Sequence, residues 1–466
     1  MKLFNLKINN FNRMRHFKKS VISILFIGAF ITAFSNAMAG QRFRAAVVKV
    51  NITPETSQML RGYEPRMSTG VLDSIYHRII ALDDGKNRFV LISTEVSGFS
   101  PAFYDRVATR IHKQLGISPM NLWWSTTHTH SAPSVAPQFS GVIFPELSER
   151  AKLAAKYEKD ITFTELLEEK LIEGIGEALN KFEPARIGMG WGFSLANINR
   201  RALDVEGRAS LGMNPGGAVD RKIGLLRIDR EDGAPLACIA NYPMHGTVFG
   251  PQNTLISGDA PGTVSDYVEQ KIGVPLLFIN GAAGNIAPIY SYPNHVDNHP
   301  IHLSQLNQFR ELLGDKILDA FKKITDSTDE VTLKTGSIIV ETPRVPELEF
   351  SSILNEYIRT TDSGVKLARL PIRFLKINQE TAIWSAPVEL FCEISNEIRN
   401  QSPFPYTFFF GYTNGSLGYL VTENAYKHGG YEPSVSPFSP QAASDLTEVV
   451  LTYLQGELKS DKPVKE

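Results

Sequence analysis

The chain has 466 residues, of which 42% are hydrophobic and 21% are charged, and its formal net charge at pH 7 is −1. This balance argues against nucleic acid as a partner, because proteins that bind nucleic acids usually carry a clear basic excess. The length allows one large domain or two ordinary ones. Only two cysteines are present, Cys238 and Cys392, each within an apolar segment, so core packing and not disulfide bonds must stabilise the fold.

The first 39 residues have the pattern of an export signal. Six lysines and arginines, with no acidic residue, precede an apolar run at residues 21–34, and Ala37-Met38-Ala39 matches an A-x-A cleavage site. The alternative is a membrane anchor that is never cleaved, but the run is shorter than the about 20 residues that cross a bilayer. We therefore predict a signal peptide at residues 1–39 and a secreted or periplasmic protein that begins near Gly40.

Strands and helices alternate along the first half of the remaining chain. Residues 44–51 form an apolar run typical of a strand, and Asp83-Asp84-Gly85-Lys86 separates two β-rich runs, 75–82 and 89–96, as in a hairpin. An amphipathic helix at 101–115 then leads to a strand that begins in the run 121–124, the order of elements found in α/β proteins. Further on we expect a charged helix at 150–182, a strand at 185–191, a loop at 197–201 and a hairpin of strands at 222–229 and 236–242.

The second half of the chain continues this pattern. Residues 274–279 have the character of a buried parallel strand and lead into the glycine-rich segment 280–288. Pro387 is expected to open a helix that carries Glu389 in its first turn. The other expected elements are helices at 301–324 and 441–458, strands at 331–341, 367–377, 381–384, 406–410 and 419–421, and a charged, disordered tail at 459–466.

The segment from Trp124 to Pro133 holds the densest group of side chains that can bind a metal. His128 and His130 are two residues apart, so a strand that continues through them places both imidazoles on one face. Two neutral imidazoles can share a zinc site, or one can bind the metal while the other hydrogen-bonds to what the metal activates. The alternative is a pair of histidines that hydrogen-bond to the neighbouring serine and threonine side chains.

Four segments with chemically active residues share one position relative to the predicted strands. His128, His245, the loop 281–284 and Glu389 all lie just beyond the C-terminal end of a predicted strand. Open α/β sheets place their ligand sites at those ends, so the four segments can meet at one pocket. The predicted fold is therefore α/β: a single large domain at residues 40–458 with mixed β-sheets, flanking helices and a metal site at the C-terminal ends of strands.

One set of motifs stands out, whereas the signatures G-x-S-x-G, H-E-x-x-H, Walker A, G-x-G-x-x-G and C-x-x-C are absent. The set resembles the motifs of the neutral/alkaline ceramidase family, specifically that family's catalytic domain, from about Arg44 to about Glu432. Each motif is weak alone, and the ordered set is specific. It consists of Thr127-His128-Thr129-His130-Ser131, Asn197-Ile198-Asn199-Arg200, His245 followed by Ile256-Ser257-Gly258-Asp259, Pro387-Val388-Glu389, and Tyr419-x6-Tyr426-x4-Tyr431-Glu432.

The resemblance implies a Zn²⁺ site with four ligands, namely His128, His245, Glu389 and Tyr419. Two imidazoles, a carboxylate and a phenolate suit zinc and leave room for a water or a substrate carbonyl. The resemblance also implies three catalytic residues near the scissile bond: His130 for proton transfer, Arg200 for oxyanion stabilisation and Tyr431 as a second donor to the oxyanion.

Each of these residues also has an ordinary explanation. His245 fits a capped loop histidine, and Glu389 in a first helical turn is favoured by the helix dipole alone. Tyr419 fits a core aromatic residue, and Arg200 beside Arg201 fits a surface pair. A further histidine-rich segment, with His295, His299 and His302, is either a metal-binding loop or the rim of the pocket.

One departure from the family bears on the reaction. The ceramidases have a serine important for amide cleavage at the position of Ala287, which offers no nucleophile. The expected function is therefore an exported zinc-dependent hydrolase of an N-acyl, ceramide-like amide that uses metal-activated water. The expected partner is a small lipid-like substrate, with peripheral membrane contact. Two alternatives stay open: a zinc hydrolase of a different amide or ester, and a non-catalytic zinc-containing lipid-binding protein.

Overall fold

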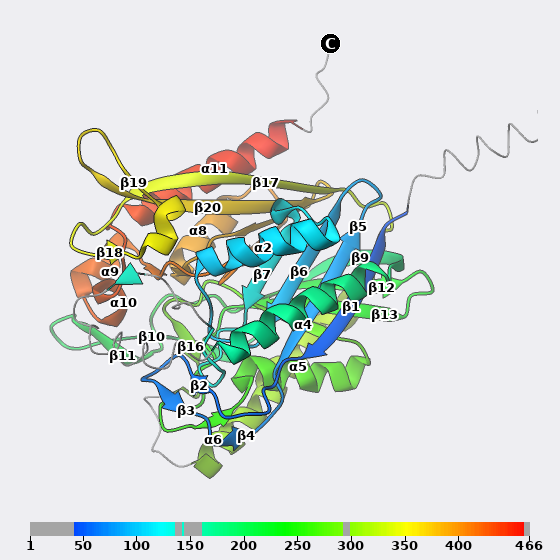
Figure 1. Ribbon diagram of the computed structural model, residues 1–466, viewed down its shortest axis with the longest axis horizontal. Coiled ribbons are helices and arrows are strands. Elements are labelled where there is room, and N and C mark those ends of the chain that lie inside the picture. Colours follow the sequence, from blue (N-terminus) through cyan, green and yellow to red (C-terminus); the bar gives the residue numbers. More distant parts are fainter. Residues whose placement is uncertain (1–41, 136–141, 144–160, 292–298, 461–466) are drawn as a thin grey trace, which may run out of the picture. The chain divides into compact units, whose positions relative to one another are not determined.

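The computed structural model describes residues 42–135, 142–143, 161–291 and 299–460 (Figure 1). The predicted signal peptide lies outside these residues, so export stays a prediction. Within the described part of the chain, no helix combines the length and the apolar character needed to cross a membrane. The unit from Phe43 onward is built in four layers: helices, a large sheet, a second sheet and further helices.

The large sheet has eight strands in the order β15-β13-β12-β9-β1-β5-β6-β7. Its neighbours are antiparallel except for the outer pairs β13–β15 and β6–β7, which are parallel. In the same order, the strands are Leu276–Asn280, Pro235–Tyr242, Lys222–Arg230, Glu183–Phe193, Arg44–Asn51, Tyr76–Asp83, Arg88–Thr94 and Leu122–Thr126.

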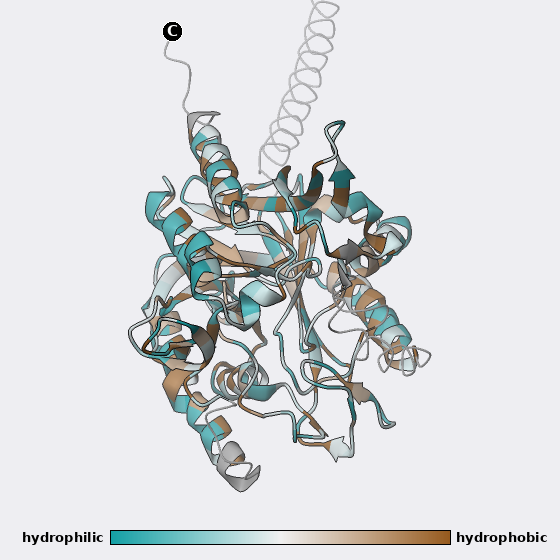
Figure 2. Ribbon diagram, turned by 90° about the vertical axis from the view of Figure 1, so that its left-hand side faces the viewer, coloured by the Kyte–Doolittle hydropathy of each residue, from teal (hydrophilic) through white to brown (hydrophobic). Residues whose placement is uncertain are grey.

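Both faces of the large sheet are buried, which explains why its strands read as continuous apolar runs. In β5, Ile79 packs toward helices α2 (Pro101–Leu115) and α4 (Thr162–Leu179), whereas Ile80 on the opposite face packs toward the second sheet. Helix α5 (Asp259–Ile272) and the helical segments after it cover the β12–β13–β15 part of the first face. These covering helices are amphipathic, as their mixed colouring by hydropathy shows (Figure 2).

The second sheet has the order β17-β20-β21-β23, with β19 paired to β20. Its inner face shares a core with the large sheet, and its outer face packs against α8 and α11. The pair β21–β23 is parallel, so both strands end on the same side of the molecule. The bounds are β17 Leu333–Pro343, β19 Ile358–Thr360, β20 Lys366–Ile377, β21 Thr381–Ser385, β23 Tyr406–Phe410, α8 Cys392–Gln401 and α11 Ala442–Ser460.

Shorter elements surround the strand ends and supply most of the loops discussed below. The short strands are β2 Met59–Leu60, β3 Arg66–Met67, β4 Gly70–Val71, β8 Val142–Ile143, β10 Asn197–Leu203, β11 Ala209–Asn214, β14 Leu255–Ile256, β16 Ile286–Pro288, β18 Glu349–Phe350, β22 Glu389–Leu390 and β24 Tyr419–Leu420. The other helical segments are η1 Pro119–Asn121, α6 His299–Phe309, the π-helix Arg310–Gly314, α7 Asp315–Lys323, η4 Ser352–Tyr357, α9 Glu423–His428 and α10 Tyr431–Ser434.

The predicted α/β class, with mixed sheets and flanking helices, is confirmed. Both predicted hairpins are present, and Gly85 and Gly233 provide the positive φ angles that their tight turns require. Cys238 and Cys392 are buried free thiols, as expected. Of the predicted helix 150–182, the described part is Thr162–Leu179.

Three local predictions are wrong. Residues 197–201 are not a loop but strand β10, because the buried Asn197 and Asn199 amides donate to backbone carbonyls of neighbouring segments. The helix expected at 301–324 is divided by the π-helical turn that ends at Gly314, where the chain packs on Tyr267. The last helix extends to Ser460, two residues beyond its expected end.

Candidate active site

Several strand ends converge on one region between the two sheets. The parallel pairs β6–β7, β13–β15 and β21–β23 all run toward it. The segments that follow β7, β13 and β21 carry His128, His245 and Glu389, and the first and last of these residues are 389 − 128 = 261 positions apart in the sequence. The structure brings these three side chains within contact distance of one another, as the strand-end argument predicts.

His128 is fixed in a sharp turn, not on a strand. β7 ends at Thr126, and His128 adopts a left-handed backbone conformation with φ 61°. The expectation that His128 and His130 share a strand face is therefore wrong, although both rings reach the same place. The Nδ1–H group of His128 donates a hydrogen bond to the carbonyl oxygen of Ser97 at 2.6 Å. This bond orients the ring so that Nε2 points inward.

His245 follows β13 and is oriented in the same manner. Its Nδ1 donates to the carbonyl oxygen of Ile286 at 3.1 Å, so its Nε2 also faces the interior. A backbone bridge joins the two histidine loops, since Gly246 donates to the carbonyl of His128 and His130 donates to the carbonyl of Gly246. The three imidazoles are thus carried by two segments that form one rigid unit.

Glu389 comes from a short strand and not from a helix. It pairs with Tyr419 in the parallel β22–β24 ladder, and α8 begins only at Cys392, so the expectation of a first-turn position is wrong. Pro387 does favour a helix start, but the backbone amide of Glu389 donates to Gly418 instead. The ladder places Glu389 and Tyr419 next to each other on one side of the sheet pair.

The distances within this group fit a metal ion. The ligand-capable atoms of His128, His130 and His245 all lie within 4.8 Å of one another, and Glu389 Oε2 lies 3.3 Å from His128 Nε2 and 3.5 Å from His245 Nε2. Neighbouring ligands of a tetrahedral zinc ion with bonds of about 2.0–2.1 Å lie about 3.3 Å apart. His245 Nε2 and Glu389 Oε2 are buried without a hydrogen-bond partner among the described residues. The donor set and its spacing therefore suit zinc.

The electrostatics of the group favour metal binding at neutral pH. Burial, together with nearby Arg200, lowers the pKa of His245 to about 3, and burial beside His128 lowers the pKa of His130 well below its usual value. Burial alone would raise the pKa of Glu389, but the adjacent imidazoles, His128 first, hold it well below its usual range. Neutral imidazoles and an ionised carboxylate are the forms that bind metals.

His130 lies closer to the ligand group than its predicted role requires. Its Nε2 is 3.3 Å from His128 Nε2, the same spacing as between His128 and Glu389. Its Nδ1 is buried and has no partner among the described residues. By distance alone, His130 suits either a third imidazole ligand or a group for proton transfer beside the metal.

Arg200 is buried and oriented by two partners. Its Nη2 donates to the Tyr419 hydroxyl at 3.0 Å, and its Nε donates to Glu432 at 2.8 Å. Glu432 also accepts from Arg201 at 2.6 Å, so the two arginines are not the surface pair that the sequence left open. Glu432 is absent from the predicted site residues, although the motif that ends in Tyr431-Glu432 contains it.

Tyr419 and Tyr431 occupy different depths. Tyr419 is buried, and burial together with the nearby Glu389 carboxylate raises its pKa well above the usual value despite the adjacent Arg200, so it keeps its proton unless a metal ion binds it. Tyr431, at the start of α10, is 43% exposed, and its ring centroid lies 5.8 Å from that of Tyr419. Tyr431 therefore lies at the mouth of the site.

No serine replaces the missing family nucleophile among the residues considered from the sequence. Ala287 lies buried in β16, opposite Ile198 of β10. The Ser131 hydroxyl accepts from Asn253, and the Ser257 hydroxyl donates to Asp73 at 2.7 Å. Both hydroxyls are thus engaged in holding loops together.

Tyr412 is a residue of the site that sequence reasoning missed. Its ring stacks on the His128 imidazole at a centroid distance of 4.2 Å and an interplanar angle of 29°. It follows β23, so the strand-end argument applied to residues 406–410 would have reached it. The apolar run before it gave no indication of a functional residue.

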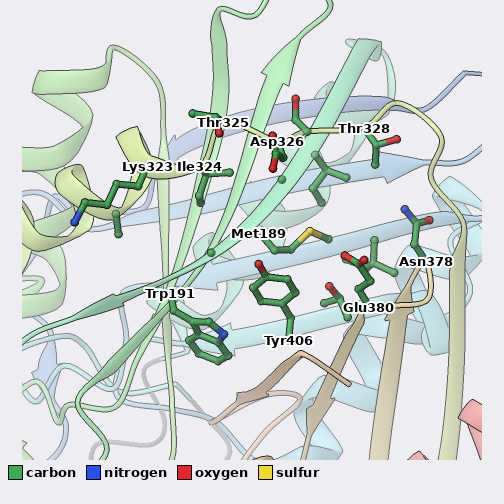
Figure 3. A pocket seen from close by; sticks show the side chains of 17 residues that line it. Met189, Trp191, Lys323, Ile324, Thr325, Asp326, Thr328, Asn378, Glu380 and Tyr406 are labelled. Carbon is green, nitrogen blue, oxygen red and sulfur yellow. The ribbon is translucent and has the colours of Figure 1, made fainter. Parts of the chain in front are cut away.

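The histidine-rich segment stays untested, and one cavity lies away from this site. His295 lies outside the described residues, and His299 and His302 fall in α6, so a metal-binding loop or pocket rim there stays a prediction. A cavity of about 500 Å³ lies at the opposite ends of β21 and β23, with Trp191, Glu380 and Tyr406 in its lining (Figure 3). It contains none of the predicted site residues.

Comparisons with known proteins agree with this geometry. The chain is 26% identical over 205 residues to neutral ceramidase B of Dictyostelium discoideum, a match that covers 42% of this chain and only 27% of that protein. The crystal structure of neutral ceramidase from Pseudomonas aeruginosa has the same fold, with a TM-score of 0.69 and 18% identity over 91% of this chain and 75% of that one. A second structure, ceramidase complexed with C2, matches with a TM-score of 0.69 and 19% identity over 91% and 76% of the two chains.

The family model described as neutral/alkaline non-lysosomal ceramidase, N-terminal, matches residues 43–287. This segment covers more than half of the chain and includes four of the candidate site residues, His128, His130, Arg200 and His245. It confirms the resemblance that the motifs indicate. The chain belongs to the neutral/alkaline non-lysosomal ceramidase family.

Proposed function

We propose that the protein is an exported, zinc-dependent hydrolase of an N-acyl, ceramide-like amide. Membership of the ceramidase family supports the reaction class. The observation that carries the proposal is the buried group of His128, His245 and Glu389, whose inward-facing atoms lie at metal-ligand spacing and in which His245 Nε2 and Glu389 Oε2 have no hydrogen-bond partner among the described residues. Such a group is costly to maintain in a protein core unless a ligand completes it.

The zinc ion would be held by His128, His245, Glu389 and Tyr419. Zinc in such a site supplies a Lewis acid for the amide oxygen and activates water. The chain prepares the ligands itself: Ser97 and Ile286 fix the two imidazole tautomers through their carbonyl oxygens.

Three other residues complete the proposed chemistry. His130 lies beside the ligand group, and its neutral imidazole would relay a proton from the attacking water to the leaving amine. Arg200, held by Glu432, is a fixed cation for the developing oxyanion. Tyr431 is placed at the mouth to donate to the same oxygen. Because residue 287 is alanine, the nucleophile is water and not a side chain.

The absence of the family serine favours one alternative, a zinc hydrolase of a different amide or ester. The variant Ala287→Ser separates the two functions. A gain in N-acylsphingosine cleavage supports a ceramide-like substrate, whereas a gain confined to other esters or amides supports the alternative. A non-catalytic, zinc-containing lipid-binding protein is the remaining possibility, and it predicts tight lipid binding without cleavage.

The central experiment combines metal analysis with an activity assay. Wild-type protein should contain one zinc ion per chain and hydrolyse a short-chain N-acylsphingosine, and both His128→Ala and Glu389→Gln should lose metal and activity together. The matched control is His112→Ala, since His112 is an exposed histidine of α2 remote from the site. Stoichiometric zinc with no cleavage of any amide or ester would reject the enzyme.

Export and membrane contact belong to the same proposal. A mature chain that begins near Gly40 is expected in the periplasmic or secreted fraction, and its mass determines the cleavage site. Sedimentation with lipid vesicles tests the peripheral membrane contact expected of an enzyme with a lipid-like substrate. Recovery of the full-length chain in the cytosol would contradict export.

A further inference from the structure

Tyr412 combines three unusual features in one residue. It is 2% exposed, its backbone is left-handed with φ 52°, and its hydroxyl has no hydrogen-bond partner among the described residues. Its ring lies against two of the imidazoles, with centroid distances of 4.2 Å to His128 and 6.3 Å to His245. None of these features is explained by packing alone.

The backbone conformation of Tyr412 is imposed by its neighbours. A left-handed conformation costs about 1–2 kcal/mol for a residue with a side chain. Here Thr126 donates to the carbonyl of Tyr412, and Trp124 and Asn414 exchange two hydrogen bonds. The preceding Gly411 lies so close to the carbonyl of Gly281 that a Cβ atom would be 2.3 Å from that oxygen. Strain that the surrounding structure enforces in this way is typical of functional sites.

The hydroxyl of Tyr412 differs from the hydroxyls of other buried tyrosines in this chain. Tyr104 donates to the carbonyls of Pro119 and Leu122, and Tyr242 donates to the carbonyl of Ser194. A buried hydroxyl without a partner costs about 1–3 kcal/mol, and phenylalanine would stack on His128 equally well without that cost. The hydroxyl is therefore unfavourable for folding and requires another reason.

The position of the ring limits what can approach the hydroxyl. The Tyr412 ring lies beside His128 and His245, whose Nε2 atoms both approach Glu389 Oε2, and the phenol is near enough to Glu389 and Arg200 for both charges to affect its pKa. To this group of side chains, a substrate of the proposed class brings its scissile amide. Its oxygen is an acceptor, which is what a phenolic donor needs.

We propose that the Tyr412 hydroxyl donates a hydrogen bond to the oxygen of the scissile amide and strengthens this bond as negative charge develops there. This role rests on the proposed function and adds a catalytic residue to it. Tyr412 keeps its proton throughout, so no group other than the amide oxygen changes its bonding to the tyrosine. Tyr412 would also supply a hydroxyl to a site that lacks the family serine, because residue 287 is alanine.

The variant Tyr412→Phe tests the proposal because it keeps the ring stack and removes only the hydroxyl. For a short-chain N-acylsphingosine we expect kcat to fall about 10- to 100-fold and KM to rise about 5-fold, because the hydroxyl binds the amide oxygen in the ground state and binds it more strongly as charge develops. Zinc content should stay at the wild-type value. The urea midpoint of unfolding should stay the same or rise, because an unsatisfied buried group is removed.

The matched control is Tyr104→Phe, which removes a hydroxyl with two partners far from the site. It should lower the unfolding midpoint and leave kcat unchanged. Wild-type kcat in Tyr412→Phe would overturn the proposal, and so would a loss of zinc from this variant, which would make the tyrosine a metal ligand instead.

A binding measurement separates this inference from the proposed function. If wild-type protein cleaves no amide, the proposed function fails, and calorimetric titration of both proteins with the same N-acylsphingosine still tests the contact. Affinity at least 5-fold weaker in Tyr412→Phe supports the hydrogen bond to the amide, and equal affinity rejects it.

Discussion

Two groups of buried polar side chains in this protein differ in how completely they are paired. In the first, which we call the Arg78 cluster, Arg78 and Glu95 are each 1% exposed. The Arg78 guanidinium binds Glu95 at 2.5 Å, Glu269 at 2.6 Å and Asp266 at 2.9 Å, and Lys49 binds the latter two. This cluster joins β5 to α5, and each of its charged groups has at least one partner of opposite charge.

The second group, the histidine cluster of His128, His130, His245 and Glu389, is equally buried and is left incomplete. One atom each of His130, His245 and Glu389 has no partner among the described residues. Because unpartnered buried groups are destabilising, the difference indicates that the Arg78 cluster serves the fold and the histidine cluster serves a ligand. Burial and charge alone do not distinguish a structural group from a binding site, whereas pairing does.

The largest effect is expected from breaking the Arg78 cluster. Arg78→Met leaves the Glu95 carboxylate buried without its main partner, so the free energy of unfolding should fall by about 3–5 kcal/mol, measured by urea denaturation. The control is Arg88→Met, because the Arg88 side chain is 56% exposed and its ion pair with Asp83 contributes little. A loss below 1 kcal/mol in Arg78→Met would refute the structural role of the cluster.

A fourth buried histidine, His77, extends the comparison to the dependence of stability on pH. Both ring nitrogens of His77 are bonded, to Thr94 and to the carbonyl of Leu167, and burial lowers its pKa to about 4. The unfolded chain takes up this proton near pH 6.5, so the stabilisation is complete above pH 6.5 and is lost as the pH falls toward 4, by roughly 3 kcal/mol. Urea denaturation of wild-type and His77→Gln proteins at pH 7, 5.5 and 4.5 should show a steeper loss for wild type. Parallel curves would contradict this.

Metal addition should stabilise the protein through the histidine cluster only. At a zinc concentration 100 times the dissociation constant, wild-type protein should gain about 2.7 kcal/mol against unfolding. Arg78→Met should gain the same increment from its lower starting point, and Glu389→Gln should gain much less. Thermal unfolding with zinc and with a chelator measures all three. An equal gain in Glu389→Gln would place the metal elsewhere.

The smallest effect is expected for Glu389→Gln without metal. The substitution removes the charge that the adjacent imidazoles stabilise but keeps the shape of the side chain, and Oε2 makes no hydrogen bond among the described residues, so the free energy of unfolding should fall by only about 1 kcal/mol. Urea denaturation in the presence of a chelator checks this value. A loss as large as that of Arg78→Met would mean that the two clusters are both structural.

The sequence is sufficient to predict that the site residues meet, but it is not sufficient to predict the local backbone geometry around them. Strand ends and motif order indicated that His128, His245 and Glu389 meet, because sheet topology brings distant strand ends together. The left-handed turn at His128 was not predictable, since it depends on hydrogen bonds to Val96 and Ser97 across the sheet edge. Nor was the two-residue strand β22, which is too short to produce a periodic pattern.

Residues whose role depends on long-range contacts could not be predicted from the sequence. Glu432 acquires its role only when α10 packs beside β10 and its carboxylate meets Arg200 and Arg201. Tyr412 lies in a turn whose contacts come from β7 and from the loop after β15. Long-range contacts of this kind leave no local signal, so the fold class and the metal-capable residues could be predicted while the supporting residues could not.

The backbone bridge between the two histidine loops restricts how the protein can vary. A Cβ atom on residue 246 would lie 2.6 Å from the Cα of Thr129, so any side chain there would push the loops of His128 and His245 apart. A saturation library at position 246, screened for zinc retention, should therefore return glycine alone. Variants designed to change the substrate should therefore keep the backbone bridge at Gly246 intact. Substitutions around the exposed Tyr431 are the better choice.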